Sequence, residues 1–213
     1  MAARSTFLEA YQNRAYAQRY ERQVAAVRAA EEKARPGSTI LAETVARNLF
    51  KAMAIKDEYE VARLYTDGSF ARQVSAQFES VERLEFHLAP PILGRTGSDG
   101  KPVKSSFGPW MMTGFRILAG LKGLRGTVLD IFGRTEERRM ERRLLAEYEQ
   151  DIAMIGGELT AARLDAACAL ASVPSLVRGF GHVKAGNAQK AAAERKRLLE
   201  RFGPTAEVLQ AAE

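Results

Sequence analysis

Apolar side chains recur every three or four residues along most of this chain, and this spacing limits the folds available to it. Tyr20, Val24 and Val27 form one such series, and Leu41 and Val45 begin another. Residues at this spacing lie on one face of an α-helix, where they pack against neighbouring helices. Aromatic residues make up only 8% of the chain. The sequence therefore predicts a mainly α fold, an antiparallel bundle-like domain of about seven helices.

Capping residues, prolines and glycines divide the chain into expected helices. The first should run over 6–34 and end at Arg35-Pro36-Gly37. Ser38 or Thr39 should cap a second helix that continues towards Tyr65. Further helices are expected over 69–78, 109–121, 135–155, 160–171 and 185–202. Ser69, Thr135 and Thr160 mark three of the starts, and Gly156-Gly157 should end the helix at 135–155.

The pattern changes to a period of two in the middle of the chain. Leu84, Phe86 and Leu88 alternate with polar residues, which is typical of a half-buried strand. Prolines and glycines follow, and a short return over 103–105 is compatible with a second strand. The sequence therefore predicts a small β-hairpin or extended excursion over 83–106.

These elements suggest how the chain is organised. We expect a single helical domain over 1–213, since no low-complexity linker interrupts it. Within it we expect an N-terminal helical unit at 1–82, an insertion of hairpin, loop and helix at 83–134, and a C-terminal helical unit at 135–213.

The segment 123–134 is a loop rich in both glycine and large apolar residues. Its glycines permit backbone conformations that other residues rarely adopt. Val128, Leu129, Ile131 and Phe132 would be costly to expose, so we expect them to be packed. The segment should therefore be a fixed part of the fold and not a free linker.

Positive charge is concentrated in the middle of the chain. The net charge is +6, and the segment 95–143 holds eleven Lys or Arg against five Asp or Glu, so it accounts for the whole excess. Arg138, Arg139, Arg142 and Arg143 lie within one expected helix. Such a patch fits an acidic protein surface, a cofactor phosphate or nucleic acid, but charge alone favours a solvated arginine-rich helix face.

Few residues are available for catalysis or metal binding. The chain has one cysteine and two histidines, His87 and His182. Cys168 lies in an alanine-rich helical segment, where a small buried side chain is expected. A disulfide, an iron-sulfur cluster or a structural zinc cannot be built from this chain alone. We therefore expect no catalytic, cofactor-binding or metal-binding residues here.

Two other patterns also lack support for chemistry. Gly179 and Gly181 give a Gly-x-Gly sequence that precedes an expected helix, but it lacks the βαβ context of a phosphate-binding loop. Asp57, Glu58 and Glu60 could resemble an acid/base pair. We expect these carboxylates to form a solvated helix face.

Several sequence segments together resemble the C-terminal domain of indolepyruvate ferredoxin oxidoreductases, the long fused bacterial type of 2-oxoacid:ferredoxin oxidoreductase. The resemblance covers nearly the whole chain and keeps the same order. The segments that carry it are Phe7–Gln12, Leu49-Phe50-Lys51, Lys56–Tyr65, Phe86–Pro91, Phe107–Met111, Leu121–Thr127, Phe132–Arg142 and Arg178–Lys184. Departures are small: Ile55 stands where an aromatic is expected, and 128–131 replaces a loop expected to contain proline.

The resemblance implies a parent enzyme that oxidatively decarboxylates an aryl pyruvate to an acyl-CoA, with ferredoxin as electron acceptor. It implies thiamine diphosphate with Mg²⁺, an iron-sulfur cluster and coenzyme A, all bound by the preceding domains. The partners implied are the catalytic domains of the same polypeptide, ferredoxin, and further copies of the parent. No catalytic residue is carried over to this chain, which is expected to be inactive by itself.

We interpret the chain as an accessory domain that packs on the catalytic domains. As a hypothesis, the loops at 86–91, 107–111, 123–134 and 178–184 share one face and form its docking surface. The candidate docking or anion-contact residues are His87, Trp110, Arg125, Arg134, Arg138, Arg142, Arg178, His182 and Lys184.

An alternative is a basic binding module that contacts ferredoxin or nucleic acid through 95–143. A stand-alone enzyme is a third possibility, and it has the least support because no catalytic spacing is present. No stretch of about twenty apolar residues occurs, and the N-terminus does not resemble a secretory signal. We therefore expect a cytoplasmic protein that does not contact the membrane.

Overall fold

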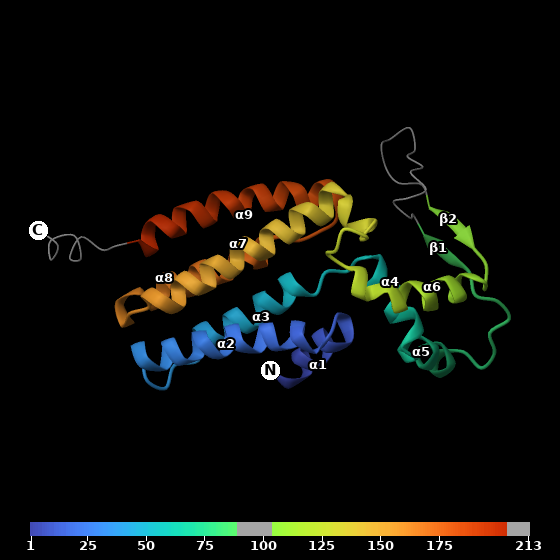
Figure 1. The fold of residues 1–213 in the computed structure, drawn as a ribbon, viewed down its shortest axis with the longest axis horizontal. Coiled ribbons are helices and arrows are strands. Elements are labelled where there is room, and N and C mark those ends of the chain that lie inside the picture. The colour runs from blue at the N-terminus through green and yellow to red at the C-terminus, as the bar shows by residue number, and fades with distance from the viewer. Residues whose placement is uncertain (89–103, 204–213) are drawn as a thin grey trace, which may run out of the picture. The chain divides into compact units, whose positions relative to one another are not determined.

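The computed structural model describes residues 1–88 and 104–203, and this part of the chain is mainly helical with one small antiparallel sheet. The predicted fold class is thus confirmed. The chain divides into two compact units (Figure 1): unit 1 comprises Met1–Ala54 and Arg139–Glu213, and unit 2 comprises Ile55–Arg138. The division differs from the predicted boundaries after 82 and 134, because the helices on either side of unit 2 share one core.

Unit 1 is built from α-helices that lie side by side (Figure 1), and unit 2 is inserted into the chain between the third and fourth of them. Its α-helices are α1 (Ala2–Tyr11), α2 (Arg14–Ala34), α3 (Ile40–Met53), most of α7 (Glu136–Glu158), α8 (Leu164–Ser172) and α9 (Gly181–Phe202). Two 3-10 helices, η4 (Ala161–Arg163) and η5 (Val173–Leu176), flank α8. None of the described helices combines the length and apolar character that crossing a membrane requires.

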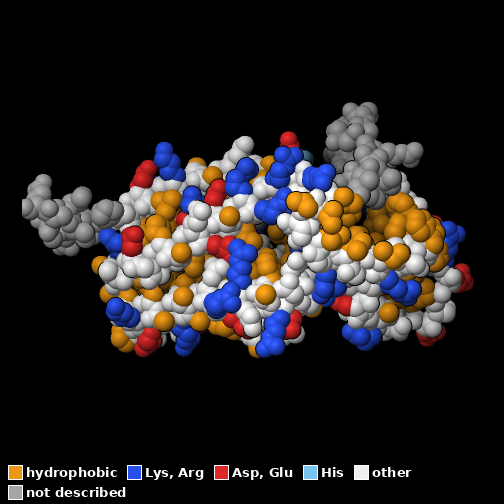
Figure 2. Space-filling view, viewed as in Figure 1, with side chains coloured by type: hydrophobic (Ala, Val, Ile, Leu, Met, Phe, Trp, Pro, Cys, Tyr) orange, Lys and Arg blue, Asp and Glu red, His pale blue; other side chains and the backbone are white. Residues whose placement is uncertain are grey.

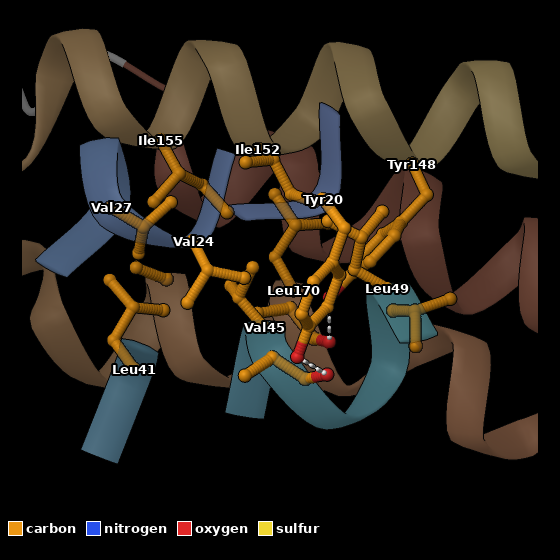
Figure 3. Close-up of a cluster of buried hydrophobic side chains, with 14 of the residues drawn as sticks. Tyr20, Val24, Val27, Leu41, Val45, Leu49, Tyr148, Ile152, Ile155 and Leu170 are labelled. Atoms are coloured by element: carbon orange, nitrogen blue, oxygen red, sulfur yellow. Dashed lines mark hydrogen bonds between the residues drawn. The ribbon is translucent and has the colours of Figure 1, made fainter. Parts of the chain in front are cut away.

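The core of unit 1 joins residues that are far apart in the sequence (Figure 3). Val24 of α2, Leu49 of α3 and Ile155 of α7 are each at most 1% exposed. The hydroxyls of two buried tyrosines are hydrogen-bonded within this core. Tyr20 donates to the carbonyl of Ala46 at 2.9 Å, and Tyr148 donates to the carbonyl of Ala171 at 2.8 Å. Each large side chain buried here stabilises the fold by about 1.5–3 kcal/mol relative to an exposed one.

The predicted long helix over 6–34 is interrupted. α1 ends at Tyr11 and α2 begins at Arg14, with Asn13 in an extended conformation between them. The Asn13 side chain accepts a hydrogen bond from the backbone N–H of Tyr16 at 2.9 Å. An asparagine in this position satisfies a helix-end donor that would otherwise be unpaired, so it favours a new helix start.

The predicted helix from Ser38 towards Tyr65 is also two helices. α3 ends at Met53, and α4 (Glu58–Thr66) begins in unit 2 with Asp57 as its N-cap. By contrast, a helix end was predicted at Gly156-Gly157, but α7 continues through these glycines to Glu158. The cap predicted at Thr135 is present, since its hydroxyl accepts from the backbone N–H of Arg138 at 3.3 Å.

A buried carboxylate, Glu31 of α2, holds the start of α3. It is 0% exposed, and it accepts hydrogen bonds from the backbone N–H groups of Leu41 (3.0 Å) and Ala42 (2.8 Å) and from the Ser38 hydroxyl (2.6 Å). Burial acts to raise the pKa of Glu31, but these hydrogen bonds outweigh it and hold the pKa below its usual value. Thr39, predicted as a possible cap, instead directs its hydroxyl to Glu43.

Unit 2 combines short helices with the predicted hairpin. Its α-helices are α4, α5 (Ser69–Gln77) and α6 (Met111–Gly120), followed by 3-10 helices η2 (Leu121–Leu124) and η3 (Phe132–Arg134). Strands β1 (Phe86–Leu88) and β2 (Ser105–Phe107) pair antiparallel, with Phe86 opposite Phe107. The rest of the predicted hairpin falls on residues 89–103, which lie outside the described part of the chain.

Aromatic rings form the small core of unit 2. Tyr65 stacks on Phe115 with ring centroids 4.9 Å apart, and both meet Phe86 edge-on at 5.3 Å. The apolar stripe predicted for α5 is only partly used: Phe70 packs edge-on against Tyr65, whereas Phe78 is 58% exposed. Helix α5 therefore rests on this core through one end.

Cys168 lies half-buried against the core of unit 1. Burial, reinforced by the carboxylates of Glu31 and Asp165, raises the pKa of its thiol to about 11. The predicted buried position is therefore only partly correct. The thiol is nevertheless an inert one, because the thiolate is the reactive form.

We expect Cys168 to resist alkylation. At pH 8 only about 0.1% of the thiol is ionised at such a pKa, so iodoacetamide should react at least about tenfold more slowly than with an exposed cysteine. The Ser80→Cys variant supplies that exposed cysteine in the same molecule. Peptide mass spectrometry over time would compare the two positions, and equal rates would contradict the assignment.

Candidate functional site

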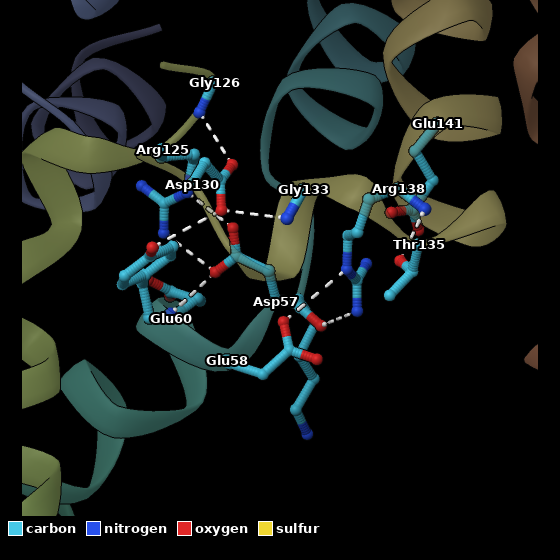
Figure 4. Close-up of polar contacts among 12 residues, drawn as sticks. Asp57, Glu58, Glu60, Arg125, Gly126, Asp130, Gly133, Thr135, Arg138 and Glu141 are labelled. Carbon is cyan, nitrogen blue, oxygen red and sulfur yellow. Dashed lines mark hydrogen bonds and ion pairs between the residues drawn. The ribbon is translucent and has the colours of Figure 1, made fainter. Parts of the chain in front are cut away.

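The segment that follows α6 in unit 2 folds back onto the start of α4, and Asp130 is the centre of this arrangement (Figure 4). Asp130 is 5% exposed. Its carboxylate accepts hydrogen bonds from the backbone N–H groups of Gly126 at 2.8 Å and Gly133 at 2.9 Å. Two points of the segment 124–134, which we call the docking loop, are thereby tied to one buried side chain.

An ion pair joins the docking loop to α4. Arg125 donates from Nε to Asp57 Oδ2 at 2.5 Å and from Nη2 to Asp57 Oδ1 at 2.9 Å. Asp57 also accepts from the backbone N–H of Glu60 at 2.9 Å, so the helix cap and the ion pair share one carboxylate. Paired, hydrogen-bonded charges of this kind are costly to break, because either partner alone would be a buried charge.

Tyr59 fills the space beneath the loop. Its ring lies under the Arg125 guanidinium at 5.5 Å and meets Phe132 edge-on at 5.3 Å. Burial, followed by the carboxylates of Asp130 and Asp57, raises the pKa of Tyr59 to about 12. The hydroxyl therefore stays protonated and points to Asp130 Oδ1 at 3.4 Å.

Turns within the loop complete its fixed shape. Gly126 adopts a positive φ of 77°, which favours glycine. The Thr127 hydroxyl donates to the carbonyl of Leu124 at 2.7 Å and accepts from the backbone N–H of Leu129 at 3.2 Å. Arg134 donates to the carbonyl of Val128 at 3.0 Å. The loop is thus held at several points along its length.

The apolar side chains of the docking loop mostly face solvent. Val128 is 85% exposed, Leu129 is 64% exposed and Ile131 is 56% exposed. The prediction that all four apolar residues are packed is therefore wrong for these three and correct only for Phe132, which is 8% exposed. The inner side of the loop is occupied by Asp130 and Phe132, so the intervening side chains are directed outward.

The prediction that the carboxylates at the start of α4 form a solvated helix face is also wrong. Asp57 and Glu60 are 5% and 3% exposed, and Glu60 forms a two-bonded pair with Arg63 at 2.7 and 2.8 Å. Burial raises the pKa of Glu58, although Arg138 lies 3.7 Å from its Oε2. The spacing of Asp57 and Glu60 is that of a capping box, and it could have revealed the helix start.

Five of the candidate residues lie in unit 2. Arg125 and Arg134 belong to the docking loop, and Arg138 also donates to the backbone carbonyl of Lys56 at 3.3 Å. His87 is exposed on β1, where its Nδ1 lies 3.0 Å from the Ser106 hydroxyl. Trp110 is 64% exposed and packs edge-on against the Phe107 ring at 5.9 Å.

The remaining four candidates lie in unit 1. Arg142 is exposed on α7, and His182 is exposed in the first turn of α9. Arg178 donates to the carbonyl of Ser175 at 2.9 Å, and Lys184 pairs with Glu141. Because 178–184 and the other three predicted loops belong to different units, their sharing one face stays a prediction.

The part of the chain that the structure describes contains no group of three or more His, Cys, Asp or Glu side chains placed to hold a metal ion. The polar residues around Asp130 are paired with one another and with backbone groups. This arrangement fixes a loop and supplies no open set of ligands. We therefore regard the exposed tip of the docking loop as the candidate functional feature.

Comparison with known proteins identifies the family. A family model described as "Family of unknown function (DUF6537)" matches residues 1–197. The chain belongs to this family. No curated protein and no solved structure matched the chain. Since the match runs through the whole of unit 2 and most of unit 1, both units are part of what defines the DUF6537 family.

Proposed function

We propose that this DUF6537 chain is the non-catalytic C-terminal domain of an indolepyruvate ferredoxin oxidoreductase and that it packs on the catalytic domains of the same polypeptide. The segments that carry the resemblance support this. Residues 56–65, 121–127 and 132–142 are distant in sequence, yet they supply Asp57, Arg125 and the Gly133 N–H to one hydrogen-bonded cluster. They therefore describe a structural arrangement and not a set of reacting groups.

The parent enzyme would oxidatively decarboxylate an aryl pyruvate to an acyl-CoA and pass the electrons to ferredoxin in the cytoplasm. The residues of this chain do not fit its cofactors. The single cysteine, Cys168, is half-buried with a raised pKa, whereas a cluster needs several thiolate ligands. We assign thiamine diphosphate, Mg²⁺, the iron-sulfur cluster and coenzyme A to the preceding domains.

One observation carries the packing role: a firmly held loop presents large apolar side chains to solvent. Val128, Leu129 and Ile131 are exposed above a scaffold whose polar groups are paired. Exposed apolar patches on an ordered surface mark interaction sites. A fixed loop also loses little conformational entropy when a partner binds, which favours docking.

The alternative role, a basic module contacting ferredoxin or nucleic acid, has less support. Arg125 forms an ion pair with Asp57, and Arg138 lies beside Glu58. These pairs neutralise part of the positive charge predicted for 95–143. Steep salt dependence of ferredoxin reduction, weakened by charge reversal at Arg142, would favour the alternative.

The packing role predicts that Leu129→Asp damages the full-length enzyme. A charge at the centre of the apolar tip should reduce indolepyruvate-dependent ferredoxin reduction by roughly tenfold, because it must be desolvated in the interface. Ile40→Asp is the matched control, since Ile40 of unit 1 is also 64% exposed. The rate at which each full-length variant reduces ferredoxin would compare the two substitutions.

Removal of the domain tests the same proposal more broadly. A parent enzyme from which this domain, residues 1–213 of the present sequence, has been deleted should assemble poorly and lose activity. Unchanged assembly together with unchanged ferredoxin reduction would rule the packing role out.

A further inference from the structure

Helix α6 is apolar on the side that faces away from the core of unit 2. Trp110 at its start is 64% exposed, Ile117 is 63% exposed, and Leu121 just after its end is 43% exposed. Their spacing of seven and four residues places them on one side of a helix. Figure 2 shows hydrophobic side chains gathered over this part of unit 2.

The opposite side of α6 already forms the core. Phe115 is 5% exposed, and Met111 and Leu118 pack against the same cluster. The outer side should therefore carry charge, as the solvent face of an amphipathic helix does. Between the large apolar residues it instead carries Thr113 and Gly114. A helix that is apolar on both sides is typical of one that is covered on both sides.

Gly114 has no evident role inside this chain. A Cβ added there would meet only Met111 Sδ at 3.5 Å, an ordinary contact distance. Glycine is nevertheless among the least favourable residues in the middle of a helix. A partner whose backbone approaches closely at this point would account for it, because a side chain would hold the partner away.

The charged residues of the segment that carries this surface have one sign. From Ser105 to Leu129 the chain holds Arg116, Lys122 and Arg125 and no Asp or Glu. Arg125 is paired with Asp57, while Arg116 is exposed at the edge of the outer side of α6. The surface therefore complements a partner with acidic side chains around an apolar contact.

We propose that the outer side of α6, formed by Trp110, Gly114, Ile117 and Leu121, packs against an α-helix of the catalytic domains of the same polypeptide. That helix approaches closely at Gly114 and carries acidic residues beside its apolar contact. This rests on the proposed function and adds to it a second contact surface with a defined chemistry.

Cysteine labelling tests the proposal in the full-length polypeptide. Ile117→Cys and Ile40→Cys replace the same residue type at nearly equal exposure, 63% and 64%. Iodoacetamide labelling followed by peptide mass spectrometry gives the rate at each position. We expect position 117 to react at least about fivefold more slowly than position 40, because a packed helix excludes the reagent. A smaller difference would overturn the proposal.

Salt separates the acidic contact from a purely apolar one. High salt should speed labelling at position 117 and leave position 40 unchanged, since screening weakens the charge pairs at the edge. Labelling at 117 that does not respond to salt would overturn the acidic chemistry. Protection that is lost on dilution, or that needs anionic lipid vesicles, would assign the surface to a second copy or to a membrane and would also overturn the proposal.

Failure of the proposed function has a different signature. The unmodified full-length protein would then show no indolepyruvate-dependent ferredoxin reduction, whatever the labelling rates. Full activity with equal labelling at 117 and 40 would instead reject the α6 contact alone.

Discussion

Replacing Asp130 with alanine should lower the free energy of unfolding of unit 2 by about 2–4 kcal/mol. The buried carboxylate pairs with the backbone N–H groups of Gly126 and Gly133, and Tyr59 directs its hydroxyl to it. Without it, the Gly133 N–H and the Tyr59 hydroxyl are buried without this acceptor, or the loop must open to water. Either outcome loosens the docking loop on α4, to which the Arg125–Asp57 ion pair still joins it.

Trp110 makes this effect measurable in unit 2 alone. It is the only tryptophan of the chain and lies in unit 2, so its fluorescence during urea unfolding reports on that unit. Asp130→Asn keeps one acceptor oxygen and should lose less stability than Asp130→Ala. Asp165→Ala, at an exposed position in unit 1, is the control. An Asp130→Ala midpoint equal to that of the control would show that the loop does not depend on this carboxylate.

Glu31→Gln should destabilise unit 1 by about 2–4 kcal/mol, because a buried amide replaces the carboxylate that accepts from Leu41, Ala42 and Ser38. An amide has only one acceptor oxygen, and its NH₂ group would face these donors. The start of α3 would then lose its cap. Thermal unfolding followed by circular dichroism would measure the loss.

The same carboxylate gives a defined pH dependence. Its pKa is lower in the folded protein than in the unfolded chain, so it stabilises the fold above its ordinary pKa, and this stabilisation is lost as pH falls through the folded pKa. The difference in stability between wild type and Glu31→Gln should therefore shrink at acidic pH. Glu32→Gln, at the neighbouring exposed position, should show little change. A difference that stays constant down to the lowest pH would contradict the role of the charge.

The helices were predictable because burial on one side imposes a periodic pattern, but this pattern does not reveal two of their breaks. Asn13 and Asp57 interrupt stretches whose apolar spacing continues without a gap. At both positions a short polar side chain caps a new helix, and this local hydrogen bond outweighs the periodic pattern. Gly156-Gly157 gave the opposite error, since packing of α7 carries the helix through a sequence that would weaken it alone.

The candidate site was less predictable, because a loop has no period that tells which side chains face inward. In the docking loop the buried anchor Asp130 is charged, whereas three of the four apolar residues predicted to be packed are exposed. The partners of Asp130 are mostly backbone N–H groups, whose direction depends on the completed fold. Sequence identified 123–134 as a fixed segment, whereas the identity of its buried anchor required the structure.

The order of the two units along the chain has a consequence for how the protein is made. Unit 2 is one continuous stretch, whereas unit 1 is completed only by residues that follow it. During synthesis, α2 and α3 leave the ribosome before their partners in α7, α8 and α9 exist. The apolar surface that α2 and α3 bury against these later helices therefore stays exposed until the inserted unit has emerged, and the last helices translated then close the core around the first.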